Sequence, residues 1–251
     1  MFAVEVRELS KSFPAESAPR PGLFSWLRPR APAAWVPALE DVDFTVEFGE
    51  IVGIVGANGS GKTTLLRILA ALEVPDTGEA TVCGFDVERD AAEVRRNVGI
   101  VLSEDRGFQR AATLRRNLEL AGAECGRHVG KPDIYYALDA AGLIQRADDR
   151  YSTLSTGLKR RLSLARALLG DPRVLLLDEP VRSVDAEFAA RIADVIRHAA
   201  HSRGATVILV SHSPEEVRNL CDRSLLLDRG RLLHVTAPRK PALAAHTAVG
   251  R

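Results

Sequence analysis

A glycine-rich turn limits the folds open to this chain more than any other stretch. The sequence VGANGSGKTTLLRIL, residues 55–69, lies between a short apolar run and an apolar helical pattern. It fits the pattern G-x-x-x-x-G-K-[ST] through Gly56, Gly61, Lys62 and Thr63. In such a turn the backbone N–H groups converge on phosphate oxygens at a helix N-terminus, the lysine adds positive charge, and the hydroxyl can ligate Mg²⁺. The flanking strand and helix patterns argue against a chance match, so the stretch predicts a phosphate-binding loop.

Short apolar runs recur along the chain and predict a buried, mostly parallel sheet. No polar alternation marks a wet face in these runs, and helical patterns separate them, which is typical of α/β layering. The block from about 104 to 160 has helical periodicity without a convincing strand and predicts a helical subdomain inserted into the sheet. The runs are 51–55, 98–102, 174–178, 206–211 and 224–228, and the helical patterns include 61–72, 132–141, 157–170 and 185–203.

The composition is that of an ordinary globular chain and excludes several classes of protein. With 251 residues, 46% of them hydrophobic and 27% charged, one large domain, or one domain with a subdomain, is expected. The 34 basic and 33 acidic residues nearly cancel, which gives no reason to expect a nucleic-acid coat. Cys83, Cys125 and Cys221 are too few and too widely spaced for a disulfide framework or a zinc site, so buried or idle thiols are expected. No apolar run reaches the ~18 residues of a membrane helix, and we expect a cytosolic chain whose membrane attachment depends on a partner.

Residues 14–38 differ in composition from the rest of the chain. They hold six of its 13 prolines, both of its tryptophans and three arginines. Proline fixes φ and lacks an N–H, so neither a regular central strand nor a long helix is expected, and a short helix around GLFSWL is the most the segment can hold. Trp26 and Arg28 suit an interface with lipid headgroups, and a tolerated surface loop is the alternative. The tail from about 233 to 251 is expected to be poorly ordered.

The sequence VLLLDEP, residues 174–180, places two acids at the end of a predicted strand. Asp178 can hold Mg²⁺ through water at that position, and Glu179 can orient and deprotonate an attacking water. Acidic residues at strand ends are common, so the pair needs the support of a further motif.

The stretch LSTGLKRRLSLARALL, residues 154–169, narrows the kind of nucleotide machine. Ser155 and Gly157 stand at the start of a predicted helix, where a hydroxyl and free N–H groups suit an anion. One phosphate loop serves one triphosphate, so a second anion site implies a second nucleotide contributed by another subunit. Here the sequence resembles the ATP-binding-cassette (ABC) transporter ATPases, whose signature motif reads LSGGQ where this chain reads LSTGL. The resemblance covers roughly residues 3–232, and the order of its motifs is highly specific.

The resemblance implies a fold, ligands and partners. The fold is an α/β P-loop NTPase with a RecA-like core, an N-terminal antiparallel β subdomain and an inserted α-helical subdomain. The ligands are ATP and Mg²⁺, and the activity is ATP hydrolysis coupled to transport. The partners are a second copy of the chain or a sister cassette, together with integral-membrane permease subunits that hold the protein at the cytoplasmic face of the cell (inner) membrane. Nucleic acid is not an expected partner.

The resemblance also implies roles for individual residues. His212 in VSHS matches the switch histidine that contacts the γ-phosphate, and Asp185 in SVDA matches the D-loop that runs between two subunits. Phe13 in LSKSF falls where the family stacks an aromatic ring on adenine, with a core phenylalanine as the alternative. The full expected set is Glu179, His212 and Lys62 for catalysis; Phe13, Gly56, Asn58, Gly59, Ser60, Gly61, Lys62, Thr63, Thr64, Ser155, Gly157 and Asp185 for ATP binding; and Thr63 and Asp178 for the metal.

Two groups of residues depart from the family pattern or add to it. The family usually has a glutamine after GIVL, where this chain has Ser103 followed by Glu104, and serine is too short to reach as glutamine does. We expect Glu104 or a water to take part of that role at Mg²⁺. The signature also differs at Thr156 and Leu158. The basic set Lys159, Arg160, Arg161 and Arg166 is expected to face solvent or a partner, and nucleic-acid binding is the disfavoured alternative.

Two classes of cassette protein are compatible with these motifs. Soluble cassette ATPases of repair or translation show long coiled coils, zinc cysteines or two cassettes in one chain, and none of these is present, so a transporter subunit is favoured. The stretch RRNVGIVLSEDRGF together with the signature helix looks like the ABC-2-type exporter ATPases, and the insertion at 14–38 resembles that of polysaccharide and teichoic-acid exporters. Export of a polysaccharide or lipid-linked glycan is therefore expected, with drug or antibiotic export as the alternative.

Overall fold

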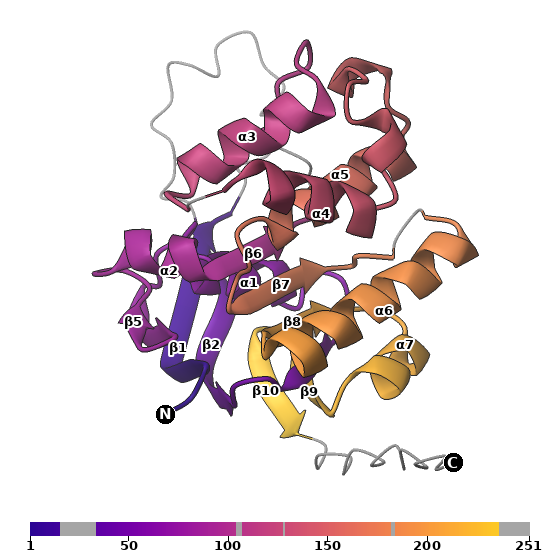
Figure 1. The fold of residues 1–251 in the computed structure, drawn as a ribbon. Helices are drawn as coiled ribbons and strands as arrows, with labels where there is room; N and C mark the ends of the chain where they lie inside the picture. The colour runs from indigo at the N-terminus through magenta and orange to yellow at the C-terminus, as the bar shows by residue number, and fades with distance from the viewer. Residues whose placement is uncertain (16–33, 104–106, 128, 182–183, 236–251) are drawn as a thin grey trace, which may run out of the picture.

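The computed structural model describes residues 1–15, 34–103, 107–127, 129–181 and 184–235, which form two sheets with helices between and around them (Figure 1). The strands are β1 (Val4–Pro14), β2 (Trp35–Val46), β3 (Ile51–Val55), β4 (Thr77–Val82), β5 (Phe85–Asp86), β6 (Val98–Val101), β7 (Val174–Asp178), β8 (Thr206–Val210), β9 (Arg223–Asp228) and β10 (Arg231–Val235). The helices are α1 (Lys62–Leu69), α2 (Ala91–Asn97), α3 (Leu114–Glu124), α4 (Lys131–Ala140), α5 (Thr156–Leu168), α6 (Ala186–Arg203) and α7 (Pro214–Leu220), with single 3₁₀ turns at Ile144–Arg146 and Tyr151–Thr153.

The larger sheet has the order β10-β9-β3-β8-β7-β6. Its strands from β9 to β6 pair in parallel, and β10 joins the edge antiparallel to β9. The mostly parallel sheet predicted from the apolar runs is confirmed, and the predicted strands and helices match the observed ones with ends that differ by at most three residues. Because β3, β7 and β8 are parallel, their carboxyl ends meet at one edge, which is where ligands bind in sheets of this kind.

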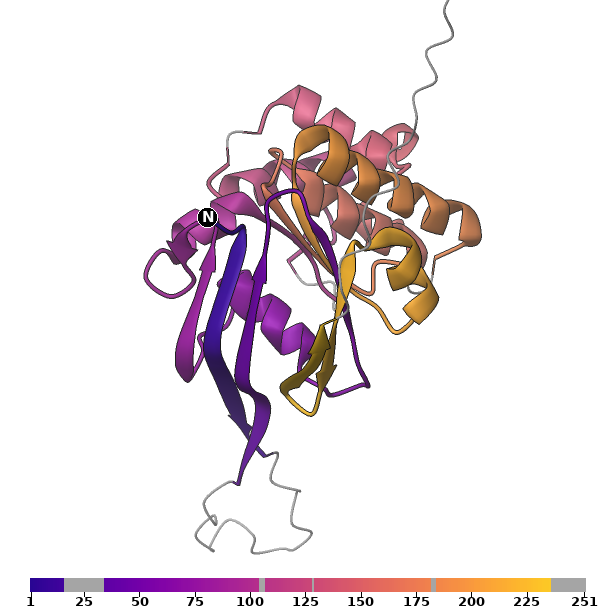
Figure 2. The same cartoon turned by 90° about the horizontal axis from the view of Figure 1, so that it is seen from below.

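Both faces of the larger sheet are covered, which explains why its strands show no polar alternation. Along β8, Ile208 and Val210 face a core shared with α1 and the smaller sheet, whereas Val207 and Leu209 face a core shared with α5, α6 and α7. Seen from below, α1 lies between the two sheets (Figure 2). The strand that precedes the glycine turn and the helix that follows it are therefore both fixed in the protein core.

The smaller sheet is antiparallel and has the order β2-β1-β4-β5, as the resemblance implied. The β1–β2 pair continues beyond the end of β4 as a two-stranded ribbon in which Phe13 is opposite Val36 and Pro14 is opposite Trp35. The ends of 14–38 form no regular central strand, as expected, but the segment holds more than the short helix that we allowed for, since Pro14 closes β1 and β2 begins at Trp35. The ribbon tolerates proline because no third strand needs the missing N–H there. The predicted short helix, Trp26 and the arginines Arg20, Arg28 and Arg30 lie outside the described residues.

Between β6 and β7 the described chain contains α3, α4, α5 and the two 3₁₀ turns, together with a single β-bridge between Thr113 and Arg150. Helix α5 carries the signature stretch and packs directly on β6. The contact is close at Gly99, where an added Cβ would lie 1.9 Å from the carbonyl oxygen of Ala167. A glycine in β6 therefore sets how near α5 can approach the sheet.

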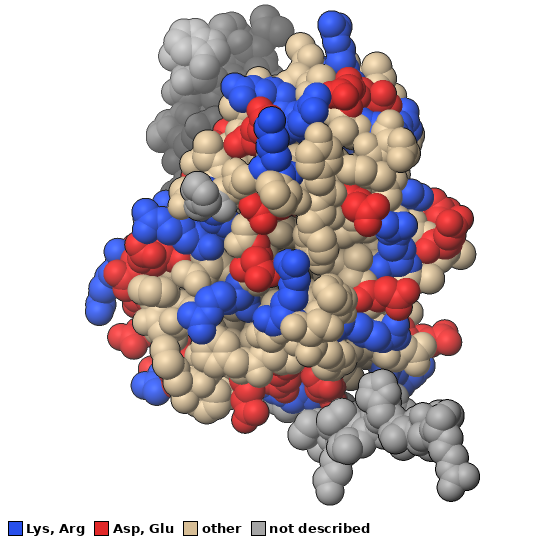
Figure 3. All heavy atoms as spheres, viewed as in Figure 1, with Lys and Arg blue, Asp and Glu red and all other residues tan. Residues whose placement is uncertain are grey.

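Two further expectations concern the ends and the surface. Strand β10 reaches Val235, so the tail begins later than the expected residue 233, and residues 236–251 lie outside the described part. Among the described residues no helix combines the length and the apolar composition required to span a bilayer. Basic and acidic side chains intermingle on the face shown in Figure 3, in line with the nearly balanced net charge.

Candidate functional site

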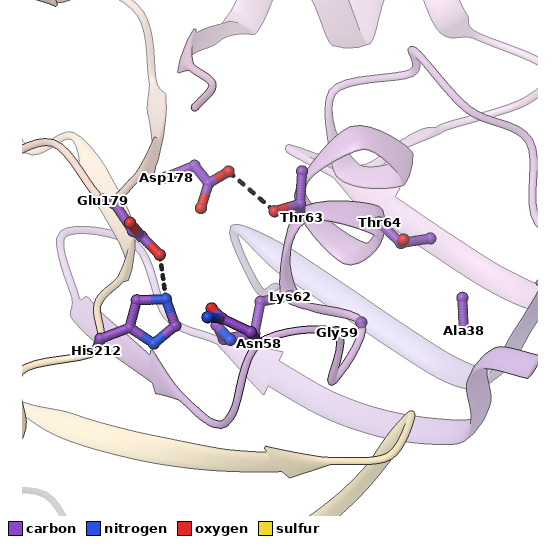
Figure 4. A pocket seen from close by; sticks show the side chains of 10 residues that line it. Ala38, Asn58, Gly59, Lys62, Thr63, Thr64, Asp178, Glu179 and His212 are labelled. Carbon is purple, nitrogen blue, oxygen red and sulfur yellow. Dashed lines mark hydrogen bonds and ion pairs between the residues drawn. The ribbon is translucent and has the colours of Figure 1, made fainter. Parts of the chain in front are cut away.

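A pocket of about 170 Å³ lies at the edge of the larger sheet where β3, β7 and β8 end (Figure 4). The loop between β3 and α1 forms its floor, and the residues that follow β7 and β8 form one wall. The topology therefore brings together segments that are more than 100 residues apart in sequence. The lining residues are Ala38, Asn58, Gly59, Gly61, Lys62, Thr63, Thr64, Asp178, Glu179 and His212.

The loop depends on a glycine directly before α1. Gly61 has φ of +103°, a value that favours glycine, and a Cβ at this position would lie 2.2 Å from the carbonyl oxygen of Ala38. With Gly61 as N-cap, the first turn of α1 begins at Lys62 and directs the N-terminus of the helix at the pocket. A helix N-terminus carries free N–H groups and partial positive charge, both of which suit a phosphate.

Lys62 is held by the loop that it follows. Its Nζ donates to the carbonyl oxygens of Gly56 at 2.9 Å and Ala57 at 2.7 Å. Burial lowers the pKa of the Lys62 ammonium below its usual range, and the carboxylates of Glu179 and Asp178 partly oppose this shift. The ammonium thus has two carbonyl partners within the loop and two carboxylates near it.

Thr63 and Asp178 make direct contact across the pocket. The Thr63 hydroxyl Oγ1 donates to Oδ2 of Asp178 at 2.9 Å, and the backbone N–H of Ser103 donates to the same oxygen at 3.4 Å. Asp178 is 2% exposed. A hydroxyl beside a buried carboxylate offers the oxygen ligands that Mg²⁺ prefers, so these two residues fit the metal. Ser103 thus contacts Asp178 with its backbone N–H. Glu104 lies outside the described residues.

Glu179 and His212 contact each other on the wall of the pocket. His212 Nε2 contacts Oε1 of Glu179, and the glutamate side chain is 13% exposed whereas the histidine side chain is 40% exposed (Figure 4). Glu179 has φ of +50°, and its N–H donates to the carbonyl of Val210 at 2.9 Å. A left-handed conformation costs a residue with a Cβ about 1–2 kcal/mol, so the surrounding structure must hold it.

Arg160 is a residue of this site that the sequence analysis missed. We expected the basic set of α5 to face solvent or a partner, and this is wrong for Arg160, which is 8% exposed and donates to the carbonyls of Leu102, Asp178 and Glu179. Its position could have been found from helical spacing, because Leu164 and Ala167, four and seven residues further on, lie on the same buried face.

The other basic residues of α5 contact the protein rather than only solvent. Lys159 lies over the ring of Tyr151, Arg161 lies over Phe188, and Arg166 lies over Phe108. The lysine and the two arginines are half-buried. These basic side chains of α5 therefore make contacts within the protein, and such contacts weaken the argument for a nucleic-acid-binding surface on this helix.

Six residues of the expected ATP-binding set are not among the residues that line the pocket: Gly56 and Ser60 of the glycine turn itself, and Phe13, Ser155, Gly157 and Asp185 elsewhere in the fold. Ser155 is the N-cap of α5, where its Oγ accepts from the N–H of Leu158 at 3.4 Å, and Gly157 follows in the first turn. Asp185 is the N-cap of α6, and its second carboxylate oxygen accepts from Arg161 at 2.7 Å. Phe13 is on the β1–β2 ribbon and is 37% exposed.

A second hollow, of about 320 Å³, adjoins the pocket behind Glu179 and His212 and reaches Glu216 on α7. Oε2 of Glu216 accepts from the Ser211 hydroxyl at 2.5 Å, whereas Oε1 is buried without a hydrogen-bond partner among the described residues. Burial raises the pKa of Glu216, the Ser211 hydrogen bond opposes that shift, and the nearby Glu179 carboxylate adds to it. Sequence analysis did not single out Ser211 or Glu216, because neither belongs to a motif with a known spacing.

Comparison with known proteins shows which family this chain is similar to. A family model described as "ABC transporter" matches residues 39–182, more than half of the chain. "Nod factor export ATP-binding protein I" of Rhizobium sp. (strain N33) is 39% identical over 199 residues, which are 78% of this chain and 65% of the relative. "ABC transporter ATP-binding protein NatA" of Bacillus subtilis is 34% identical over 79% of this chain and 81% of its own length.

A relative named for import is comparably similar. "Methionine import ATP-binding protein MetN 1" of Burkholderia ambifaria is 34% identical over 92% of this chain and 64% of its own length. The chain thus spans slightly less than two thirds of the length of several of these relatives. Among solved structures, a dimeric ATP-binding cassette in a post-hydrolysis state with ADP and Pi covers 94% of this chain and 99% of its own, with a TM-score of 0.80 and 23% identity.

Proposed function

The chain belongs to the ABC transporter family of ATP-binding ATPases, and on that premise we propose that it hydrolyses ATP to power a membrane exporter. The proposal rests on three groups of side chains that line one pocket: the lysine of the glycine turn, the Thr63–Asp178 pair and the Glu179–His212 pair. Each group would meet a different requirement of phosphoryl transfer: the first binds the phosphates, the second binds the metal ion, and the third activates the attacking water.

The glycine turn binds the phosphates of ATP in this proposal. Its backbone N–H groups and the N-terminus of α1 bind phosphate oxygens, and Lys62 exchanges its two carbonyl partners for them. The exchange is favourable because a hydrogen bond between an ammonium and an anion is stronger than one to a neutral carbonyl. Thr63 and Asp178 would hold Mg²⁺, which neutralises charge on the phosphate oxygens when it is bound.

Glu179 is the proposed general base. Its carboxylate borders the pocket and accepts the proton of the water that attacks the terminal phosphate. In the structure His212 occupies Oε1 of this carboxylate, so His212 must turn away before Glu179 can accept a proton there. A terminal phosphate is the natural new partner of the imidazole, and this exchange would link base activation to the presence of ATP.

Two chains are proposed to share each ATP molecule. Ser155, Gly157 and Asp185 lie at the N-termini of α5 and α6, away from the pocket of their own chain, so they are free to complete the pocket of another subunit. Free N–H groups at the start of α5 suit the terminal phosphate of a nucleotide held by the partner. The similar cassette in the solved structure is described as dimeric, which supports this arrangement.

Export of a polysaccharide or lipid-linked glycan is the proposed transport reaction, by an ABC-2-type permease at the cytoplasmic face of the membrane. Relatives named for export support the direction, although a relative named for import is comparably similar. The choice of a glycan as cargo rests on the Trp- and Arg-containing insertion within 14–38. Reconstitution with the permease and a labelled lipid-linked glycan tests this reading, and transport of a drug in place of the glycan would favour the alternative.

The test of ATP hydrolysis is the steady-state turnover of Glu179→Gln. Removal of a positioned base should lower kcat on the order of 10²-fold or more, while ATP still binds because the glycine turn is intact. Glu215→Gln, an exposed change on α7, serves as the control and should retain turnover. Turnover of Glu179→Gln near the wild-type value would show that another group is the base.

A further inference from the structure

Arg160 connects two regions of the molecule that the proposed function assigns to different ATP molecules. It lies in the second turn of α5, five residues after Ser155, which is proposed to contact the nucleotide of a partner. Its guanidinium reaches the ends of β6 and β7, where Nη1 donates to the carbonyl of Leu102 and Nη2 donates to the carbonyls of Asp178 and, at 2.7 Å, Glu179. One side chain thus joins the helix that carries the signature to the backbone of the proposed base.

The backbone of Glu179 is fixed from both sides. Its N–H donates to Val210 at the end of β8, and its carbonyl accepts from Arg160. Glu179 keeps a left-handed φ of +50° between these two contacts. A left-handed residue with a Cβ needs such support, so the direction of the Glu179 carboxylate depends on where α5 holds the guanidinium.

An arginine suits this task better than other cations. The guanidinium is planar and presents several N–H donors in a fixed fork, so it can bond three carbonyls at once. Arg160 is also 8% exposed, and few waters can replace these contacts if it moves. A displacement of α5 therefore pulls directly on the carbonyls of Leu102, Asp178 and Glu179.

We propose that Arg160 is a positioning residue that transmits the arrival of a partner's nucleotide at the N-terminus of α5 to Glu179 in its own subunit. The inference rests on the proposed function, because it takes Ser155 to contact a shared ATP and Glu179 to be the base. It adds a path by which occupancy of one ATP site adjusts the base of the other. The path runs through one helix and three backbone hydrogen bonds.

The first experiment compares kcat with ATP affinity in the full-length protein. Arg160→Met should lower kcat by about 10²-fold, as expected when a base is slightly misplaced, and should change the Kd of a fluorescent ATP analogue by less than about 3-fold, since the glycine turn is not altered. The matched control is Arg127→Met, because Arg127 likewise donates to several backbone carbonyls, those of Arg95, Arg96, Val98 and Leu169, and none of these residues lines the pocket. The control should lose thermal stability and keep kcat.

The second experiment tests the path itself with a double-mutant cycle. If Ser155 acts on hydrolysis through Arg160, the loss of kcat in Ser155→Ala with Arg160→Met should be close to the larger single loss, and not the product of the two. Ser155→Ala with Arg127→Met should give a simple product. If the loss of kcat in the Ser155 and Arg160 double variant equals the product of the two single losses, the proposed path is refuted.

The outcomes separate this inference from the proposed function. If the wild-type protein does not hydrolyse ATP with its permease, the proposed function fails. If the wild type is active and Arg160→Met keeps kcat within about 2-fold, or loses ATP affinity and kcat equally, the positioning role is refuted. Should Arg160→Met not fold, Arg160→Lys replaces it. A lysine keeps the charge but cannot hold three carbonyls in one plane, so kcat must still fall, and wild-type turnover in Arg160→Lys would refute the role.

Discussion

At the scale of single residues, Glu179 and Glu216 face one hollow from the end of β7 and the first turn of α7, but only Glu179 lines the phosphate pocket. Glu179 contacts the His212 imidazole on the wall of the pocket. Glu216 has a neutral donor, Ser211, on one oxygen and a buried, unbonded second oxygen. The two carboxylates of this hollow thus have different hydrogen-bond partners, and such differences allow two carboxylates in one region to have different roles.

The raised pKa of Glu216 makes a prediction about stability against pH. Since the folded state favours the protonated form, Glu216 contributes stability that is complete below its unfolded pKa and is lost as the pH rises through the raised folded pKa. Glu216→Gln does not titrate and avoids this loss. The Tm of the variant minus the Tm of the wild type should therefore increase between about pH 4.5 and pH 8.

Thermal unfolding followed by circular dichroism at several pH values gives this difference directly. Glu215→Gln is the control, because Glu215 is the exposed neighbour in the same helical turn. Its Tm difference should stay constant over the same range. A constant difference for Glu216→Gln as well would mean that Glu216 ionises as easily in the folded as in the unfolded chain.

At the scale of secondary-structure elements, the β1–β2 ribbon determines how the 14–38 insertion is attached. The ladder continues through Phe13 opposite Val36, and the N–H of Ala15 donates to the carbonyl of Ala34 at 2.6 Å. Trp35 and Val36 at this end are 67% and 53% exposed, which leaves apolar surface beside the attachment point. The described residues on either side of 16–33, Ala15 and Ala34, are hydrogen-bonded neighbours, so 16–33 can be replaced without cutting either sheet.

This geometry sharpens a prediction about transport. Replacing residues 16–33 by Asn-Gly should connect Ala15 to Ala34 by a two-residue hairpin turn. Asn-Gly favours the type I′ turn that such a short connection requires. We expect ATPase activity of the isolated protein within about 2-fold of wild type, because no residue of the pocket is removed. Transport in vesicles reconstituted with the permease should fall sharply if the insertion contacts the membrane or the permease.

The comparison needs a control for general damage to the ribbon. Replacing 16–33 with a Gly/Ser linker of equal length keeps the chain length and removes the aromatic and cationic side chains. It should lose transport as the Asn-Gly variant does. If both variants transport at the wild-type rate, the segment is a tolerated surface loop and the glycan assignment loses its main support.

At the scale of the whole molecule, the pocket of one chain contains the glycine turn and Glu179, the proposed base, but not Ser155. A closed dimer would place the N-terminus of α5 from each chain over the pocket of the other. This arrangement would give the N-terminus of α5, which lies away from the pocket of its own chain, a phosphate to bind, as proposed for the N-terminus of α1.

ATP should therefore join two chains when it cannot be hydrolysed. We expect Glu179→Gln with ATP to double in mass by light scattering, while Lys62→Ala, which lacks the phosphate-binding ammonium, remains monomeric under the same conditions. A sister cassette would give a heterodimer of the same total size. Glu179→Gln that binds ATP but stays monomeric at high concentration, with the permease also present, would contradict the shared site.

The sequence by itself determined the features that are local in the chain. Apolar runs placed β3, β6, β7, β8 and β9, because burial on both faces of a sheet requires several consecutive apolar residues. The spacing of the glycine turn placed the loop, because its conformation and its helix N-terminus are fixed by a few neighbouring residues. Both are short-range patterns, and a chain shows them whatever its remaining contacts are.

Only the tertiary structure decided which distant groups meet. The contact of Thr63 with Asp178 spans 115 residues and exists because β8 brings β3 and β7 into one parallel sheet. Arginine is usually found at the protein surface. Arg160 is buried because Gly99 lets α5 approach β6 closely enough for the guanidinium to reach the strand ends. Strand order and helix approach depend on the packing of the whole core, so no local pattern encodes them, and the hydrogen bonds that position Glu179 follow from that packing.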